Sequence, residues 1–213
     1  MDRGRTLITQ QEKMDEFWLW FESQAEQLVD QPSLEIIDEL AEQLANVDSG
    51  ITAEVSNMTE NSDRELIITA HGDASRFKLI GTLVQRAPQI PGWRVLALKP
   101  PRGFSFHVDG KERLSISDWR FVPLKSSPEF DEIGLRIEMP ERDAQKLNED
   151  ALSLVLEEGV GEVLLSLYSH IEFGSSETAG ALSIHSLAET ISDWALARGP
   201  KSIRVWLPTL EQH

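Results

Sequence analysis

Two amphipathic patterns open the chain and predict a helical hairpin. Apolar residues at the 3.6-residue helical period predict a helix over residues 10–29, and Thr9 with Glu12 forms a capping box at its start. Its buried stripe is expected to consist of Met14, Phe17, Trp18, Phe21, Ala25 and Leu28. A second helix is expected over residues 34–47, with an outer face of Glu35, Asp38, Glu39 and Glu42. We therefore expect residues 1–50 to form one helical hairpin packed on the main domain.

Short strands and amphipathic helices then follow in an order that occurs twice. In the first set, strands at 51–56 and 65–70 precede a helix at 74–87 and a strand at 93–99. In the second set, strands at 118–123 and 132–138 precede a helix at 141–157 and a strand at 162–170. Residue identity between the two sets is negligible. Order and spacing alone therefore predict an internal duplication of residues 51–100 and 117–172.

The predicted fold class is α+β. Each ββαβ unit alone would leave one face of its sheet bare, so the two units are expected to share a core. We expect a mixed sheet built from two ββαβ-like units, with helices mainly on one face and the N-terminal helical hairpin added. Residues 51–213 would then form a single domain. Further elements are expected in a hairpin around Asp109-Gly110, a helix from Leu187 and a strand at 203–207.

The 213-residue chain has a net charge of −16, and this charge is unevenly distributed along the sequence. Residues 1–50 hold 12 acidic and 3 basic side chains, whereas residues 76–125 hold 10 basic and 3 acidic side chains. Two interpretations stay open. The segments form solvated surface with some internal pairing, or one face is presented to a charged partner. The acidic total argues against sequence-independent nucleic-acid binding, which needs basic side chains to neutralise phosphates.

Composition narrows the class of protein further. The chain has no cysteine, which excludes disulfides, thiolate metal sites and cysteine nucleophiles. No apolar run approaches the roughly 18 residues of a membrane-spanning helix, and the first ten residues lack the apolar core of a signal peptide. We therefore expect a cytoplasmic protein without a membrane partner. Gly159 and Gly161 follow a helix instead of opening one, so the dinucleotide motif fails and no cofactor is predicted.

Two sets of titratable residues are candidate sites. His71 and Asp73 lie at a strand-to-helix junction, where a histidine beside an acid can act as a general base. Asp73 is also a good helix cap. His170 and Glu172 alternate on one predicted strand and His185 precedes the last helix, and two imidazoles with a carboxylate can bind a divalent metal. In both sets the competing interpretation is a group of ordinary exposed or hydrogen-bonded polar residues.

Aromatic residues give two further candidate surfaces. The run from Phe17 to Phe21 is apolar almost all round one helical turn. Either it is buried on two sides, or Trp18, Leu19 and Trp20 form a partner-binding patch. Basic residues from Arg94 to Arg120 interleave with aromatic residues, a pattern that can stack nucleobases. Strand alternation places many of those aromatic residues on the face opposite the bases, as in a half-buried sheet.

Three segments carry a resemblance to known sequences. The run from Glu65 to Asp73, the run from Leu83 to Pro88 and the run from Gly92 to Pro101 resemble uncharacterised bacterial proteins of unknown function. Gly161-Glu162 adds to this resemblance. The resemblance implies a soluble bacterial protein and carries no activity or site residue.

Three hypotheses from different classes follow from the sequence. The first is an acidic binding module, such as an immunity- or inhibitor-type protein that contacts a basic protein partner. The second is a hydrolase or metal-dependent enzyme that uses His71 with Asp73, or His170, Glu172 and His185. The third is a structural or regulatory homo-oligomer. Charge, the aromatic-rich first helix and the lack of a catalytic motif favour the first.

Overall fold

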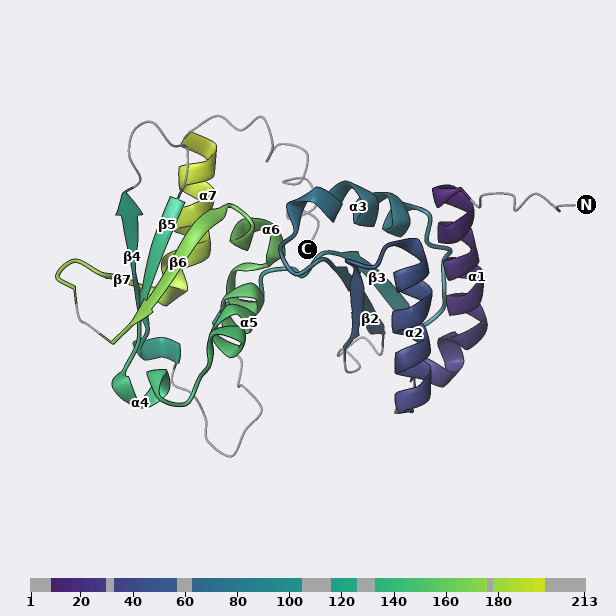
Figure 1. The fold of residues 1–213 in the computed structure, drawn as a ribbon, viewed down its shortest axis with the longest axis horizontal. Coiled ribbons are helices and arrows are strands. Elements are labelled where there is room, and N and C mark those ends of the chain that lie inside the picture. Colours follow the sequence, from purple (N-terminus) through teal and green to yellow (C-terminus); the bar gives the residue numbers. More distant parts are fainter. Residues whose placement is uncertain are drawn as a thin grey trace, which may run out of the picture. The chain divides into compact units, whose positions relative to one another are not determined.

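The computed structural model describes residues 9–29, 33–56, 63–104, 116–125, 133–175 and 178–197. The chain divides into two compact units, Met1–Leu98 and Lys99–His213 (Figure 1). We call them unit 1 and unit 2. The division falls after residue 98, between the two ββαβ sets, and differs from the boundary expected after residue 50. The helical hairpin belongs to unit 1 because its apolar side packs on the first three strands.

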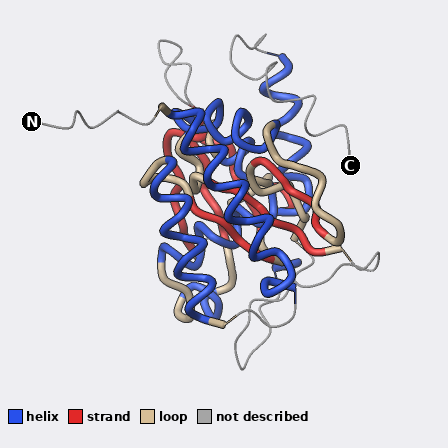
Figure 2. The backbone as a smooth tube through the Cα atoms, turned by 90° about the vertical axis from the view of Figure 1, so that its right-hand side faces the viewer, coloured by secondary structure: helices blue, strands red, loops and turns tan. Residues whose placement is uncertain are grey.

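Unit 1 is a three-stranded sheet with helices packed on it. Its elements are α1 (Gln10–Val29), α2 (Leu34–Val47), β1 (Thr52–Val55), β2 (Arg64–Thr69), the 3₁₀ turn η1 (Ala74–Arg76), α3 (Phe77–Gln85) and β3 (Trp93–Ala97). The strand order is β1-β2-β3, with β1 antiparallel and β3 parallel to β2. Figure 2, viewed from the side of α1 and α2, shows these two helices in front of the strands.

The apolar stripe of α1 holds unit 1 together. All six residues predicted for that stripe are buried, which confirms the helical period read from the sequence. Trp18 Nε1 donates to the carbonyl of Leu83 in α3 at 2.8 Å. The rings of Phe21 and Trp93 meet edge to face at 5.1 Å, an arrangement that aromatic pairs favour. The capping box also forms, since Thr9 N donates to Glu12 Oε2 at 2.7 Å.

Unit 2 is a four-stranded sheet with helices on its apolar side. Its elements are η2 (Ile116–Asp118), β4 (Arg120–Lys125), β5 (Ile133–Glu138), α4 (Glu141–Ala144), α5 (Glu149–Val160), α6 (Glu162–Leu165), β6 (Tyr168–Gly174), β7 (Leu182–Ser183), η3 (Ile184–Ser186) and α7 (Leu187–Ala197). The strand order is β6-β5-β4-β7. The core joins strand residues Phe121, Leu135 and Ile137 to helix residues Leu152, Val155, Leu156, Leu187 and Ile191.

Two elements of unit 2 differ from the sequence-based prediction. The helix expected at 141–157 is interrupted, because the Asn148 side chain caps a new helix by accepting from Ala151 N at 2.9 Å. The strand expected at 162–170 begins as the helical turn α6, and β6 starts only at Tyr168. Gly161 separates α5 from α6 with a φ of +81°, a conformation that glycine adopts readily.

The two ββαβ sets share one topology. In each set the second strand is central, its first neighbour is antiparallel and its second neighbour is parallel. The fold is therefore α+β with an N-terminal helix pair, as predicted, but the strands form two mixed sheets and not one. A common origin for the two sets stays a prediction. The predicted strand at 203–207 and hairpin around Asp109-Gly110 lie outside the described residues.

Unit 2 also buries charged side chains. Lys99 Nζ lies 3.0 Å from Glu157 Oε2, and both residues are buried. Glu162 accepts from the backbone N–H of Lys99 at 3.2 Å. Asp143 accepts from Trp119 Nε1 at 3.0 Å. Buried charges of this kind require partners, because desolvation strongly disfavours a lone ion.

Candidate functional site

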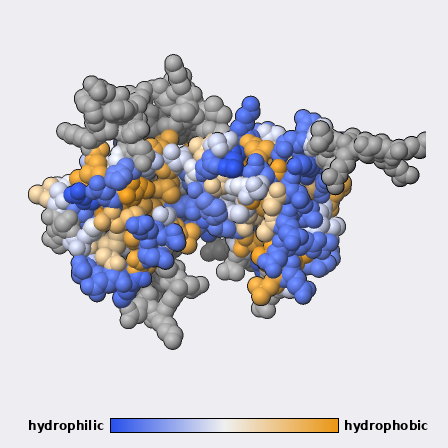
Figure 3. Space-filling model, in the orientation of Figure 1, coloured by the Kyte–Doolittle hydropathy of each residue, from blue (hydrophilic) through white to orange (hydrophobic). Residues whose placement is uncertain are grey.

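The N-terminal helix pair carries its carboxylates on the side that faces away from the sheet. The two helices contain nine acidic residues and a single base, Lys13. We define the acidic outer face as one apolar residue, Leu19, and seven exposed carboxylates: Glu16, Glu22, Glu26, Glu35, Asp38, Glu39 and Glu42. Hydrophilic residues cover this helix pair in Figure 3.

Helical spacing explains why these carboxylates share a face. Residues three, four and seven positions apart lie on one side of a helix. The four acidic residues of α2 follow that spacing, opposite the buried Ile36, Leu40, Leu44 and Val47. The helices run antiparallel, since Gln10 at the start of α1 donates to the carbonyl of Val47 at the end of α2, at 2.8 Å.

Leu19 is an apolar residue within a charged surface. Its exposed fraction is 68%, and it lies three positions from Glu16 and three from Glu22 on the same side of α1. Protein interfaces commonly place an apolar anchor inside a polar rim. Leu19 and its neighbouring carboxylates have that arrangement.

Neither of the two tryptophans beside Leu19 is largely exposed, as a contact patch would require. Trp18 is 4% exposed and points into unit 1, so its side chain is not presented at the surface. The sequence places it on the apolar stripe, and its indole N–H is already bonded within the fold. Trp20 is half-buried and donates from Nε1 to Glu39 Oε1 at 2.8 Å, which links α1 to α2. Of the three candidates, Leu19 alone is largely exposed.

Among the described residues, no basic side chain neutralises the carboxylates of the acidic outer face. Within the part of the chain that the structure describes, none of the seven forms an ion pair. Three arginines of unit 1, Arg76, Arg86 and Arg94, pair with other carboxylates. Arg86 Nη2 lies 2.5 Å and 2.7 Å from the two carboxylate oxygens of Asp15, and Arg94 lies 3.4 Å from Glu65. The internal pairing expected between acidic and basic segments is therefore present, and it leaves the outer face negative.

The ion pair between Arg76 and Asp48 lowers the pKa of the Asp48 carboxyl group. Arg76 Nε donates to Asp48 Oδ1 at 2.9 Å, and Gly50 N donates to the same oxygen at 2.8 Å. The hydrogen bond from the Arg76 guanidinium, followed by that from Gly50, holds the pKa of Asp48 below its ordinary value. This carboxylate stabilises the turn after α2, so its role is structural.

The structure gives His71 and Asp73 different partners. His71 Nε2 lies 2.9 Å from Thr52 Oγ1. Asp73 accepts from Ser75 N at 3.0 Å and pairs with the guanidinium of Arg76, so it works as the predicted helix cap. A carboxylate engaged in this way is not aligned as the partner of a general base.

The histidines and glutamate proposed as metal ligands are not gathered into a site. Glu172 pairs with Arg136 at 2.8 Å, and His170 Nε2 lies 3.1 Å from Glu172 Oε1. The Arg136 hydrogen bond, followed by that of His170, lowers the pKa of Glu172. The His185 ring meets Phe104 edge to face at 6.3 Å. Among the described residues no group of three metal-binding side chains occurs, so the predicted trio does not form.

Three aromatic residues of the described part of the basic segment lie inside the units. Trp93, Phe104 and Trp119 are buried. Trp93 Nε1 donates to the carbonyl of Ala25 at 3.2 Å. Stacking of nucleobases needs exposed ring faces, and these three rings offer none.

The α1 half of the acidic outer face has a signal in the sequence. Glu16, Glu22 and Glu26 share the face of Leu19 by spacing alone, and that pattern identifies the α1 half of the surface. Arg64, which lines a groove between α2 and β1, had no such signal. Its position depends on how α2 packs against β1, and a linear pattern does not encode that contact.

Comparison of the chain with protein-family models, curated proteins and solved structures gave no match. None of the helices in the described segments combines the length and the apolar character needed to cross a membrane.

Proposed function

We propose that this protein is an acidic binding module that contacts a basic protein partner through the acidic outer face of α1 and α2. In this role it resembles immunity- or inhibitor-type proteins, which cover a surface of their target. The observation that supports the proposal is the set of seven exposed carboxylates that have no ion-pair partner among the described residues, together with exposed Leu19 on the same outer side of α1 as Glu16 and Glu22.

Electrostatics favour a basic partner over a second copy of the chain. Complementary charge speeds association and selects the partner, whereas like charges facing each other cost several kcal/mol. A symmetric dimer through the acidic outer face would place carboxylates against carboxylates, because a twofold contact uses the same patch on both subunits. A partner rich in lysine or arginine turns the same charges into attraction.

Leu19 supplies the apolar part of the contact. Charged rims mainly set association rate and specificity, and buried apolar anchors supply much of the affinity. The proposal therefore assigns Leu19 as the anchor and its neighbours Glu16 and Glu22 as the rim. Trp20 fixes the spacing between the two helices through its bond to Glu39.

The experiment is affinity capture at low salt from an extract of the producing cells, with the captured protein identified and its affinity measured with purified components. Leu19→Ser is the test variant. Leu154→Ser is the matched control, because Leu154 is also an exposed leucine on a helix, α5 of unit 2. We expect a basic protein that binds the wild type and the control equally and binds Leu19→Ser at least about tenfold more weakly.

Salt separates this contact from non-specific adhesion. Raising the ionic strength to about 0.5 M should weaken binding strongly, because the Debye length shortens from about 10 Å at 0.1 M. The proposal fails if the captured protein is acidic, if its affinity is insensitive to salt, or if Leu19→Ser and Leu154→Ser bind alike. It also fails if no protein is retained at low salt.

A further inference from the structure

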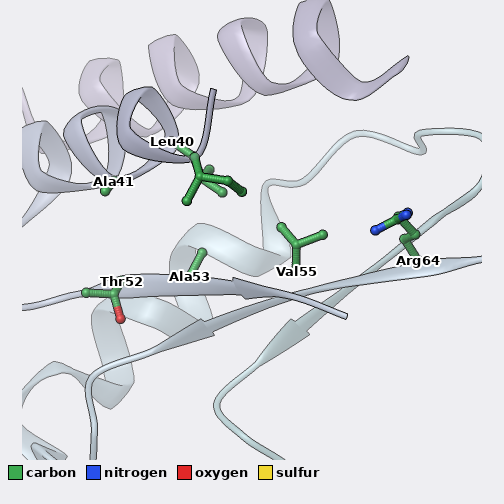
Figure 4. A pocket seen from close by; sticks show the side chains of 7 residues that line it. Leu40, Ala41, Thr52, Ala53, Val55 and Arg64 are labelled. Carbon is green, nitrogen blue, oxygen red and sulfur yellow. The ribbon is translucent and has the colours of Figure 1, made fainter. Parts of the chain in front are cut away.

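A groove runs between α2 and the first strand of unit 1. It has a volume of about 270 Å³. Its wall on the helix side consists of Ile37, Leu40 and Ala41, and its floor on the sheet side includes Ala53 and Val55 (Figure 4). Leu40 is buried, and Ala41 lies exposed at the rim. The groove is therefore apolar at its base and open to solvent.

The strand beside this groove lies at an edge of the sheet. The sheet order is β1-β2-β3, so β1 pairs only with β2 within the described residues. Ser56 N donates to Glu65 O at 2.9 Å, so the alternation of an antiparallel pair turns the backbone groups of Glu54 toward β2. The backbone N–H and C=O groups of Ala53 and Val55 therefore point the other way, toward the free edge of the sheet. The two residues whose side chains line the groove thus also carry the outward N–H and C=O groups.

One cation lies at the end of the groove. Arg64 begins β2 next to the end of β1, and its Nη1 donates to the carbonyl of Ser56 at 3.2 Å. Its Nε is buried and has no hydrogen-bond partner within the described part of the chain. A guanidinium binds carboxylates strongly, with two parallel N–H donors. Figure 4 shows Arg64 beyond Val55, at the end of the groove away from Thr52.

We propose that this groove binds the C-terminal end of an extended peptide that adds to the edge of β1. The main chain of the peptide pairs with Ala53 and Val55, its last aliphatic side chain enters the groove between α2 and β1, and its terminal carboxylate meets Arg64. Strand addition to a sheet edge is a common mode of peptide recognition, with main-chain hydrogen bonds for affinity and pockets for specificity. The peptide runs parallel to β1, because Arg64 lies where β1 ends.

Size and charge select this occupant over others. Pockets for drug-sized ligands span about 300–1,000 Å³, so a groove of about 270 Å³ suits one side chain with its carboxylate. The apolar walls exclude a charged side chain, because burial of an unpaired charge is costly. The inference concerns a different surface from the acidic outer face and does not depend on the proposed function.

The experiment is a titration of ¹⁵N-labelled protein with acetylated pentapeptides Ser-Thr-Val-Thr-Xaa, in which Xaa is Leu, Ile, Val or Phe. Each peptide is used with a free C-terminal carboxylate and as its C-terminal amide. We expect the amide signals of Ala53 and Val55 to shift with the carboxylate form of at least one peptide at concentrations up to about 1 mM. The matching amide should bind about tenfold more weakly, because it loses the charge-assisted bonds to Arg64.

Two variants on one helix give the structural control. Ala41→Glu places a carboxylate at the rim of the groove, whereas Ala45→Glu makes the same change one turn later, at an exposed residue outside the groove. Peptide binding should be lost in the first variant and unchanged in the second. Circular dichroism should show that both variants are folded. Arg64→Met should abolish the preference for the carboxylate over the amide.

Several outcomes would overturn the inference. It fails if none of the peptides shifts the β1 signals, or if acid and amide forms bind equally. It also fails if Ala41→Glu and Ala45→Glu bind alike, or if N-acetyl-leucine alone binds as tightly as the pentapeptides, since the edge strand then contributes nothing. Capture of the basic partner through Leu19 is measured separately, so each proposal can fail alone.

Discussion

The two units share a strand topology, but they differ in whether charged side chains are buried or exposed. Residues 1–98 hold 17 acidic and 8 basic side chains, and residues 99–213 hold 19 and 12. In unit 2 five charged residues are buried: Lys99, Glu138, Asp143, Glu157 and Glu162. Among the described residues of unit 1, no charged side chain is buried to that degree.

This difference shows where charge is available for binding. Unit 2 uses part of its charge inside the fold, where Lys99 pairs with Glu157 and Thr178 N donates to Glu138 at 2.9 Å. Unit 1 is held instead by the apolar stripe of α1, and its helix carboxylates stay in water. A net charge alone would not distinguish the two cases. The arrangement of the residues does, and it places the acidic outer face on unit 1.

The largest effect is expected from the buried pair of unit 2. Lys99→Met leaves the buried carboxylate of Glu157 without its cation, and loss of one partner of a buried pair costs about 3–5 kcal/mol of unfolding free energy. Urea unfolding measures this change. Lys78→Met, at an exposed lysine of unit 1, is the control and should stay within about 0.5 kcal/mol. If the free energy of unfolding falls equally little in both variants, the buried pair does not distinguish the units.

A comparable loss is expected from the apolar stripe of unit 1. Trp18→Ala removes a buried indole from α1 and should cost about 3–5 kcal/mol in the same assay. Leu19→Ala, at the next residue along the chain, should cost about 0.5 kcal/mol or less because that side chain is exposed. Similar losses from the two variants would contradict the orientation of α1.

A smaller effect is expected from the surface pair between Asp15 and Arg86. A double-mutant cycle with Asp15→Asn and Arg86→Met should give a coupling free energy of about 0.2–1 kcal/mol, because exposed ion pairs are screened by water. The coupling should fall when salt is added. A salt-independent coupling above that range would mean that unit 1, like unit 2, depends on strong ion pairs.

The smallest effects concern the pKa values of two surface carboxylates, one in each unit. The pKa of Asp48 is lowered by Arg76, and that of Glu172 is lowered by Arg136. A lowered pKa in the folded state stabilises the fold above the ordinary carboxyl pKa of about 4, and this contribution is lost as the pH falls through the folded value.

NMR titration of the carboxyl carbons measures both values. Arg76→Met should raise the pKa of Asp48 and leave that of Glu172 unchanged, and Arg136→Met should do the reverse. An unchanged pKa of Asp48 in Arg76→Met would show that Gly50 N–H, and not the guanidinium, is the main cause.

The sequence predicted the parts of the fold that depend on local periodicity. The buried stripe of α1 follows from helical spacing, and the succession of strands and helices in the two ββαβ sets follows from their apolar periods. The strand order and the strand directions come from the structure alone. The sequence did not predict the helical turn α6, because residues 162–165 read equally well as an apolar strand. The burial of Trp18 beside exposed Leu19 was available from the stripe. The sequence could not predict the pairing of Lys99 with Glu157 or the groove at Arg64, because each depends on contacts between distant segments.

The most direct test of the account compares two variants with the same change in net charge. Glu35→Gln/Asp38→Asn/Glu42→Gln removes three carboxylates from the acidic outer face, and Glu149→Gln/Asp150→Asn/Glu189→Gln removes three exposed carboxylates from unit 2. Calorimetric affinity for the captured basic protein should fall at least about tenfold in the first variant, and its salt dependence should weaken. The second variant should bind as the wild type does. Equal affinities of the two variants would show that total charge, and not the outer face of α1 and α2, determines binding.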